Sequence, residues 1–167
     1  YKSKILSEAE KAGKTVGDGG KVWFVYIGHG APSKDGMDGL ILSVDVRQEA
    51  ISIYNQGIPQ SELLKTLMSD DASPIAIIDA CFSGRDSSGA AIASNLQPLI
   101  SVKAPYQPKA TVLTAAKHDQ FAGPLPGLDR PAFSYLALGA LRGWGDANGD
   151  GSVSSREVEQ YTYNVMH

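Results

Sequence analysis

Residues 22–27 constrain the fold more than any other part of the sequence. They read VWFVYI, an unbroken run of apolar, mostly β-branched and aromatic residues that lies between Gly20 and Gly28. A run of this length and composition is typical of a strand that is buried on both faces, and such strands belong to sheets covered by helices. The run therefore predicts an α/β domain.

Further apolar runs repeat this pattern, and segments with helical periodicity separate them. Buried strands are expected at residues 22–27, 75–78 and 111–114, with a weaker strand at 40–42. Helices are expected at residues 61–68, 89–101 and 133–143. Strands that alternate with helices predict an open, mostly parallel sheet with helices on both faces.

Size and charge limit the kinds of partner. The chain has 167 residues and a formal net charge of −3, which fits one folded domain with a single core. Lysine and arginine form no cluster, so the electrostatic footprint of a nucleic-acid-binding protein is missing. No apolar run approaches the roughly 18 residues that a membrane span needs. We therefore expect neither nucleic acid nor membrane as a partner.

Two residues with catalytic side chains directly follow predicted strands. His29 comes after the first strand and Cys81, the single cysteine, comes after the second. In open α/β sheets ligands bind beyond the carboxyl ends of the strands, and neighbouring strands lie only about 4.8 Å apart. A thiolate is a strong nucleophile, and an imidazole can protonate a leaving amine near neutral pH. If the two strands are neighbours, the pattern predicts a Cys-His dyad, with the Gly30 and Cys81 amides facing an oxyanion.

Two alternatives remain open at this point. His118 follows the third predicted strand and is a competing base, although it lies in a polar segment where a solvated histidine is ordinary. The other alternative is that Cys81 is a packed core residue, because free cysteine is among the most buried residue types. The sequence spacing alone does not decide between them.

Several segments resemble the caspase-like cysteine peptidases of clan CD, the peptidase C14 family, and most of all its bacterial metacaspases. Residues 22–30 resemble the family's His-Gly block, and residues 79–84, DACFSG, resemble its Asp-x-Cys-x-Ser-Gly block. Residues 113–120 resemble the strand and loop that line the family's specificity pocket, and residues 133–143 resemble its last core helix. The resemblance covers residues 20–143 in the family's order.

The resemblance implies a caspase-like fold and a role for each residue of the dyad. It makes Cys81 the nucleophile of a cysteine endopeptidase and His29 the general acid and base. It also assigns the oxyanion hole to the backbone amides of Gly30 and Cys81.

The resemblance further implies where the enzyme cuts. Asp79 matches the acidic pocket residue of metacaspases, and Ala115 and Ala116 match residues beside it, which implies cleavage after Arg or Lys. A carboxylate in a narrow pocket pairs with a basic side chain and repels an acidic one. An alternative is that Asp79 only caps nearby amides at the end of its strand. Self-cleavage is expected after Lys103 or Lys109, in the segment where this family is commonly processed.

The sequence departs from the family pattern at three points. Phe82 stands where metacaspases often have His, and Ile27 stands where they often have Ser. The family's first core strand should also precede the helical segment near residues 7–11, and the sequence shown does not contain it. We therefore expect that the sheet is incomplete or that another chain or fragment supplies this strand.

A second motif, independent of the first, lies near the C-terminus. Residues 146–157, DANGDGSVSSRE, fit an EF-hand calcium loop, with Gly151 at the position of the sharp turn. The expected Ca²⁺ ligands, which include the backbone carbonyl of Ser152, are Asp146, Asn148, Asp150, Ser152, Ser154 and Glu157. The expected organisation is a caspase-like domain at 1–145, with the calcium loop and terminal helix at 146–167 packed on it. A solvated turn with a coincidental Glu is the alternative.

The leading prediction is a cysteine endopeptidase that cuts after Arg or Lys, processes itself, and uses Ca²⁺ for structure or regulation but no cofactor for catalysis. One rival is a catalytically silent caspase-like interaction module. Another is a calcium-dependent structural domain in which Cys81 is merely packed. A third is a caspase-like peptidase that cuts after Asp.

Overall fold

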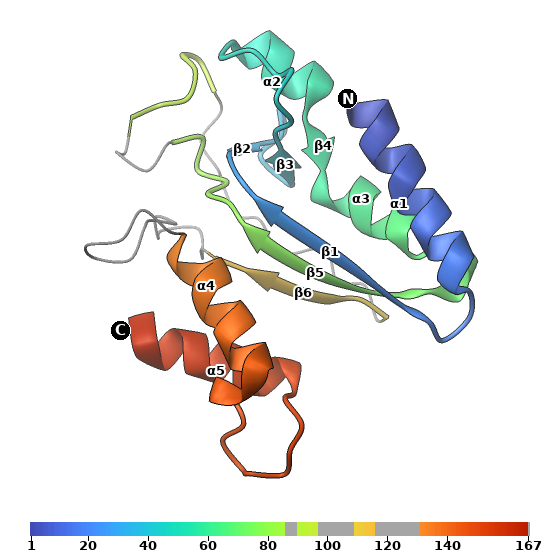
Figure 1. The fold of residues 1–167 in the computed structure, drawn as a ribbon. Coiled ribbons are helices and arrows are strands. Elements are labelled where there is room, and N and C mark those ends of the chain that lie inside the picture. Colours follow the sequence, from blue (N-terminus) through green and yellow to red (C-terminus); the bar gives the residue numbers. More distant parts are fainter. Residues whose placement is uncertain (86–89, 97–108, 116–130, 167) are drawn as a thin grey trace.

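The computed structural model describes residues 1–85, 90–96, 109–115 and 131–166, and these form an α/β structure with two sheets (Figure 1). A parallel sheet has the strand order β1-β5-β6, with bounds Lys21–Ile27, Ser73–Asp79 and Thr111–Thr114. A small antiparallel sheet joins β2, β3 and β4, with bounds Gly30–Pro32, Gly39–Ile41 and Ile58–Pro59. The three strongest predicted strands are therefore the ones that build the parallel sheet.

One face of the parallel sheet is covered by α1, Lys2–Val16, and α3, Gln60–Leu67, which pack against each other. The alternate side chains of β1 and β5 that point this way join both helices in one hydrophobic core. Its fully buried members include Leu63, Leu64 and Ile78. The helix predicted at residues 61–68 is confirmed to within one residue at each end.

The opposite face carries α4, Ala132–Gly139, the short π-helix η2, Ala140–Trp144, and α5, Ser155–Met166. Their core joins Ile77 of β5 to Phe133, Ala137 and Val158. The predicted helix at residues 133–143 is thus confirmed, and so is a terminal helix after the acidic loop. Within the described residues no helix is long and apolar enough to cross a membrane.

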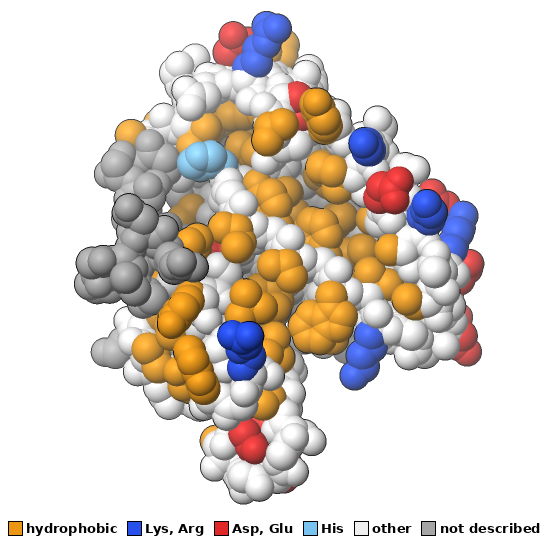
Figure 2. Space-filling view, in the orientation of Figure 1, with side chains coloured by type: hydrophobic (Ala, Val, Ile, Leu, Met, Phe, Trp, Pro, Cys, Tyr) orange, Lys and Arg blue, Asp and Glu red, His pale blue; other side chains and the backbone are white. Residues whose placement is uncertain are grey.

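In the described part of the chain, no helix covers the face of β1 on this second side. Helices α4 and α5 contact β5 and β6, whereas β1 lies at the sheet's edge and leaves Trp23, Val25 and Ile27 about half exposed. Hydrophobic side chains gather across this face in Figure 2. The prediction that helices cover both faces therefore fails over β1, although the β1 sequence is as apolar as that of a central strand.

Two other local predictions differ from the structure, and one helix was not predicted. The strand expected at 40–42 is β3, which belongs to the antiparallel sheet instead of the parallel one. The helix expected at 89–101 is wrong for residues 90–96, which form turns around a bridge between Arg85 and Ala91; residues 89 and 97–101 lie outside the described ranges. The helix that was not predicted is α2, Ala50–Gln56, which lies between β3 and β4. A short 3₁₀-helix, η1, Ser69–Asp71, connects α3 to β5.

Candidate active site

The two candidate catalytic residues follow neighbouring strands at the same edge of the sheet. Strands β1 and β5 pair in parallel with Ile27 opposite Asp79, and the amide of Gly28 donates to the carbonyl of Asp79 at 3.1 Å. His29 and Cys81 each come two residues after this pair. The condition on which the predicted dyad depended, that the strands are neighbours, is therefore met.

A close approach between the two segments explains why residue 30 is glycine. A Cβ atom built on Gly30 would lie 2.8 Å from the carbonyl oxygen of Cys81 and 2.7 Å from a ring carbon of Phe82. The Phe82 ring also lies against Gly39, where a Cβ would come within 2.6 Å of it. Phe82 is only 7% exposed, so it is a core residue that packs the two segments together.

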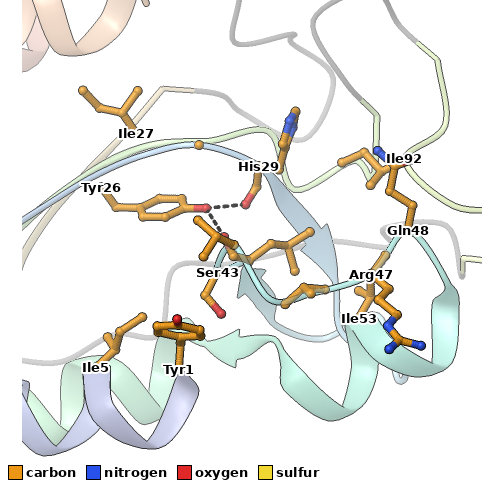
Figure 3. A pocket seen from close by; sticks show the side chains of 14 residues that line it. Tyr1, Ile5, Tyr26, Ile27, His29, Ser43, Arg47, Gln48, Ile53 and Ile92 are labelled. Carbon is orange, nitrogen blue, oxygen red and sulfur yellow. Dashed lines mark hydrogen bonds between the residues drawn. The ribbon is translucent and has the colours of Figure 1, made fainter.

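Tyr26 holds the backbone of His29 through its hydroxyl (Figure 3). Its hydroxyl lies 2.8 Å from the carbonyl oxygen of His29 and 2.7 Å from that of Leu42, and the Leu42 amide also donates to the His29 carbonyl. Burial raises the pKa of Tyr26 to about 12, so the hydroxyl keeps its proton at neutral pH. Gly28 is required here as well, because a Cβ would meet the hydroxyl at 2.6 Å.

The exposures of the two side chains differ. His29 is exposed at the end of β1, whereas Cys81 is 8% exposed and follows the central strand. The low exposure of Cys81 shields it from bulk water, while the His29 side chain is accessible to solvent. This arrangement suits a nucleophile activated by a neighbouring base.

Asp79 is buried on the α4 side of the sheet. It is 5% exposed, and its Oδ2 atom accepts a hydrogen bond of 2.7 Å from the amide of Ser134 in the first turn of α4. A carboxylate at a helix N-terminus is stabilised by the unpaired amides and by the helix dipole. The capping role weighed as an alternative for Asp79 is therefore present, and it fixes where the carboxylate lies.

The other predicted pocket and processing residues are only partly described. Ala115 is 7% exposed and continues the β5–β6 ladder, with its amide donating to the carbonyl of Ile78 at 3.0 Å. Lys109 donates to Asp71 at 2.7 Å just before β6, and this pairing raises the pKa of the lysine. The predicted residues Ala116, Lys103 and His118 lie outside the described ranges.

A hollow of about 590 Å³ opens beside His29 on the α1 side of the sheet. Figure 3 shows that its walls come from the start of α1, the end of β1, the segment after β3 and helix α2. The sequence gives no sign of this hollow, since its residues are scattered from the N-terminus to Ile92 and share no motif. We name it the His29 hollow.

The acidic loop at 146–157 is folded around its own amides. The carboxylate of Asp146 accepts hydrogen bonds from the amides of Gly149, Asp150 and Gly151, and Asn148 Oδ1 accepts from the amide of Asp150 at 2.9 Å. Gly149 and Gly151 adopt φ values of 72° and 80°, which favour glycine. Predicted ligand oxygens are thus held close together by loop hydrogen bonds.

Glu157, the last predicted calcium ligand, forms a capping box with Ser154 at the start of α5. Its Oε2 atom accepts from the amide of Ser154 at 2.9 Å, and Ser154 Oγ in turn accepts from the amide of Glu157 at 3.3 Å. The bonds from Ser154 hold the pKa of Glu157 below its usual range, while the nearby charge of Asp150 opposes this.

The donor set of the loop fits Ca²⁺ in kind, because its side-chain donors include carboxylate, amide and hydroxyl oxygens. The arrangement is that of a loop closed on itself. Among the residues that the structure describes, no three His, Cys, Asp or Glu side chains are grouped as ligands around a metal. Binding would therefore require Glu157 to turn from Ser154 toward the loop oxygens.

Comparison of the chain with protein-family models and with curated proteins finds no match. Any functional assignment therefore depends on the residues and geometry described above.

Proposed function

We propose that the protein is a caspase-like cysteine endopeptidase in which Cys81 is the nucleophile and His29 is the general acid and base. The observation that carries the proposal is the parallel register of β1 and β5, since it brings these residues to the same position at one sheet edge. Catalytic groups in open α/β sheets occur at this edge. The glycine-dependent contact between residue 30 and Cys81 keeps the two segments together.

The chemistry then proceeds through a thioester. The Cys81 thiolate attacks the scissile carbonyl carbon, and the resulting oxyanion accepts hydrogen bonds from the amides of Gly30 and Cys81. The C–N bond breaks as the His29 imidazolium transfers its proton to the leaving amine. His29 next removes a proton from water, which attacks the thioester and releases the carboxylate product and the thiolate.

Asp79 supports a preference for Arg or Lys before the scissile bond. Its carboxylate lies at the same strand end as Cys81 and is held in place by the Ser134 amide. A fixed carboxylate in a shielded position attracts a guanidinium or ammonium group and disfavours an acidic side chain. The same residue thus caps α4 and binds substrate.

The first test is hydrolysis of fluorogenic peptides that end in Arg, Lys or Asp, with Cys81→Ala as the control. We expect cleavage after Arg and Lys that is absent in the variant. Cleavage mainly after Asp would keep the peptidase and overturn the role of Asp79. No cleavage of any peptide would favour the second candidate, a catalytically silent interaction module with the same fold, in which Cys81 is only a buried core residue.

For the 146–157 loop we propose Ca²⁺ binding by Asp146, Asn148, Asp150, Ser154 and Glu157 side chains and the Ser152 carbonyl. The bound ion would fix α5 relative to α4, because the loop connects the two helices and they contact each other. The test is calorimetric titration of the protein with Ca²⁺, with Asp150→Ala as the variant. Unchanged affinity and melting temperature in the variant would reject the site.

The caspase-like fold that we propose includes a further strand along the free edge of β1. Helices α1 and α3 lie on the same face, and α3 makes the crossover from β1 to β5. Because parallel crossovers are right-handed in about 98% of cases, a strand that leads into α1 would lie on the other side of β1. A segment or second chain outside residues 1–167 would supply this strand, because in the described part of the chain β1 pairs with β5 on one side only.

A further inference from the structure

Lys109 and Cys81 lie at opposite ends of the parallel sheet, whose strands all run in one direction (Figure 1). Lys109 comes two residues before Thr111, the first residue of β6, and Thr111 pairs with Ile75 of β5. Cys81 follows Ile75 by six residues. At a rise of about 3.3 Å per residue along parallel strands, roughly 25 Å separates the two positions. The peptide bond after Lys109 is therefore far from the thiol of the same molecule.

Movement of β6 cannot bring this bond to Cys81 without dismantling the proposed substrate pocket. The residue after Lys109, Ala110, packs against the core on the α1 side of the sheet. At its other end β6 continues into Ala115, which the strand register places level with Asp79. Removal of β6 from the sheet would therefore displace the residue beside the carboxylate that a substrate lysine needs.

The Lys109 side chain is nevertheless accessible to another molecule. It is 54% exposed, and Asp71, with which it forms an ion pair at 2.7 Å, is 70% exposed. A pair between two such exposed groups contributes little to stability, because water screens both charges. The lysine can therefore leave Asp71 for a more shielded carboxylate.

We propose that a second copy of this chain is a substrate of the peptidase and is cut in trans after Lys109. This inference rests on the proposed function. The active end of the sheet in one molecule would meet the opposite end of the sheet in the other. Asp79 of the attacking molecule would then replace Asp71 as the partner of the Lys109 ammonium group.

The reaction is that of the proposed peptidase with a protein substrate. The Cys81 thiolate of the attacking molecule adds to the carbonyl carbon of Lys109 in the other molecule. The C–N bond to Ala110 breaks, and the His29 imidazolium gives its proton to the Ala110 nitrogen. Water then hydrolyses the thioester, which restores the thiolate and leaves Lys109 with a carboxylate.

The test mixes the wild type with the Cys81→Ala variant, which can be cut but cannot cut. Intact-mass spectrometry follows the two expected products, residues 1–109 and 110–167. We expect the variant to be cut at a rate proportional to the wild-type concentration. The inference would be overturned if the wild type trimmed itself at a rate constant independent of concentration while the variant stayed intact.

Two lysine variants test the assignment of the bond. In the Cys81→Ala background, Lys109→Ala should abolish both products. The matched control is Lys34→Ala, which removes another exposed lysine, in the turn between β2 and β3, and should leave the products unchanged. Products that persist in Lys109→Ala, or a cut after another residue such as Lys103, would overturn the assignment.

Two neighbouring aspartates test the competition for the lysine. In the Cys81→Ala background, Asp71→Asn should raise the rate of cutting by about two- to fivefold, the range that loss of an exposed ion pair allows. Asp70→Asn is the matched control, because the charge of Asp70 acts on Lys14 instead. Both aspartates have positive φ, which asparagine adopts readily. Equal rates in the two variants would overturn the competition between Asp71 and Asp79.

Hydrolysis of a fluorogenic peptide that ends in Lys separates failure of the inference from failure of the proposed function. If the wild type hydrolyses this peptide but leaves the Cys81→Ala variant intact, cutting in trans is wrong and the peptidase function stands. If the wild type cuts neither the peptide nor the variant, the peptidase proposal is wrong and the inference fails with it.

Discussion

Replacement of Tyr26 by Phe isolates the hydroxyl that lies between the carbonyl oxygens of His29 and Leu42. The ring keeps its place in the core, and only the contacts of 2.8 and 2.7 Å disappear. The single O–H proton is shared by two acceptors, and the His29 carbonyl retains the amide of Leu42. The loss is therefore close to one partly buried hydrogen bond, about 1–2 kcal/mol. For a protein of this size that corresponds to a fall in melting temperature of about 2–8 °C.

The assay for Tyr26→Phe combines thermal unfolding with peptide hydrolysis. The matched control is Tyr135→Phe, because no hydrogen bond of the Tyr135 hydroxyl is found within the described ranges, its side chain is 41% exposed, and its ring packs near Trp144. If Tyr26 positions His29, kcat should fall by about three- to tenfold with KM unchanged. A melting temperature equal to that of wild type would refute the energetic argument, and an unchanged kcat would refute the positioning role.

Three further predictions concern other contacts of the site and the loop. Gly30→Ala should lower stability by about 1–3 kcal/mol in urea unfolding, because its Cβ would overlap the Cys81 carbonyl and the Phe82 ring; wild-type stability would contradict that close approach. Cys81 should react with iodoacetamide at pH 7 in the folded protein, and His29→Ala should slow this reaction; an inert thiol would indicate a packed residue. Because the pKa of Glu157 is lowered in the folded protein, its capping contribution to stability is present above the ordinary pKa of glutamate and is lost as the pH falls through the folded pKa. In Glu157→Gln, the melting temperature should therefore decline less over that acidic range. Identical profiles of melting temperature against pH in the variant and the wild type would argue against the capping box.

The parallel sheet could be predicted because its strands are apolar on both faces. Residues 22–27, 75–78 and 111–114 carry that signal, and their order along the chain also predicts that the residues after them gather at one edge. The sequence predicts both His29 and Cys81 as residues that follow strands. It does not state the pairing register, which comes from the packing of α1 and α3 beneath the sheet.

The features that were missed depend on contacts between distant segments. The His29 hollow joins α1, β1, the segment after β3 and Ile92, so no window of the sequence contains it. Helix α2 is only seven residues long, and a single fully buried side chain, Ile53, anchors it. Residues 90–96 have small and apolar side chains that allow a helix, yet a bridge to Arg85 and a positive φ at Asn95 hold them in turns.

The arrangement of the whole candidate site follows from the two-residue period of a strand. On β5, Ile77 and Asp79 point to the α4 face while Ile78 points to the α1 face, and on β1 Tyr26 points to the α1 face. Strand alternation therefore places Asp79 and the His29 hollow on opposite faces of the sheet. His29 and Cys81 each follow by two residues the pair formed by Ile27 and Asp79. If β1 paired with β5 one residue out of this register, the sequence would be the same, but Gly28 or Gly30 would take the position opposite Cys81 that His29 now occupies. The tight contacts of Gly30 with Phe82 and of Gly28 with Tyr26 oppose such a slip, so these packing residues are as necessary to the proposed chemistry as the side chains that perform it.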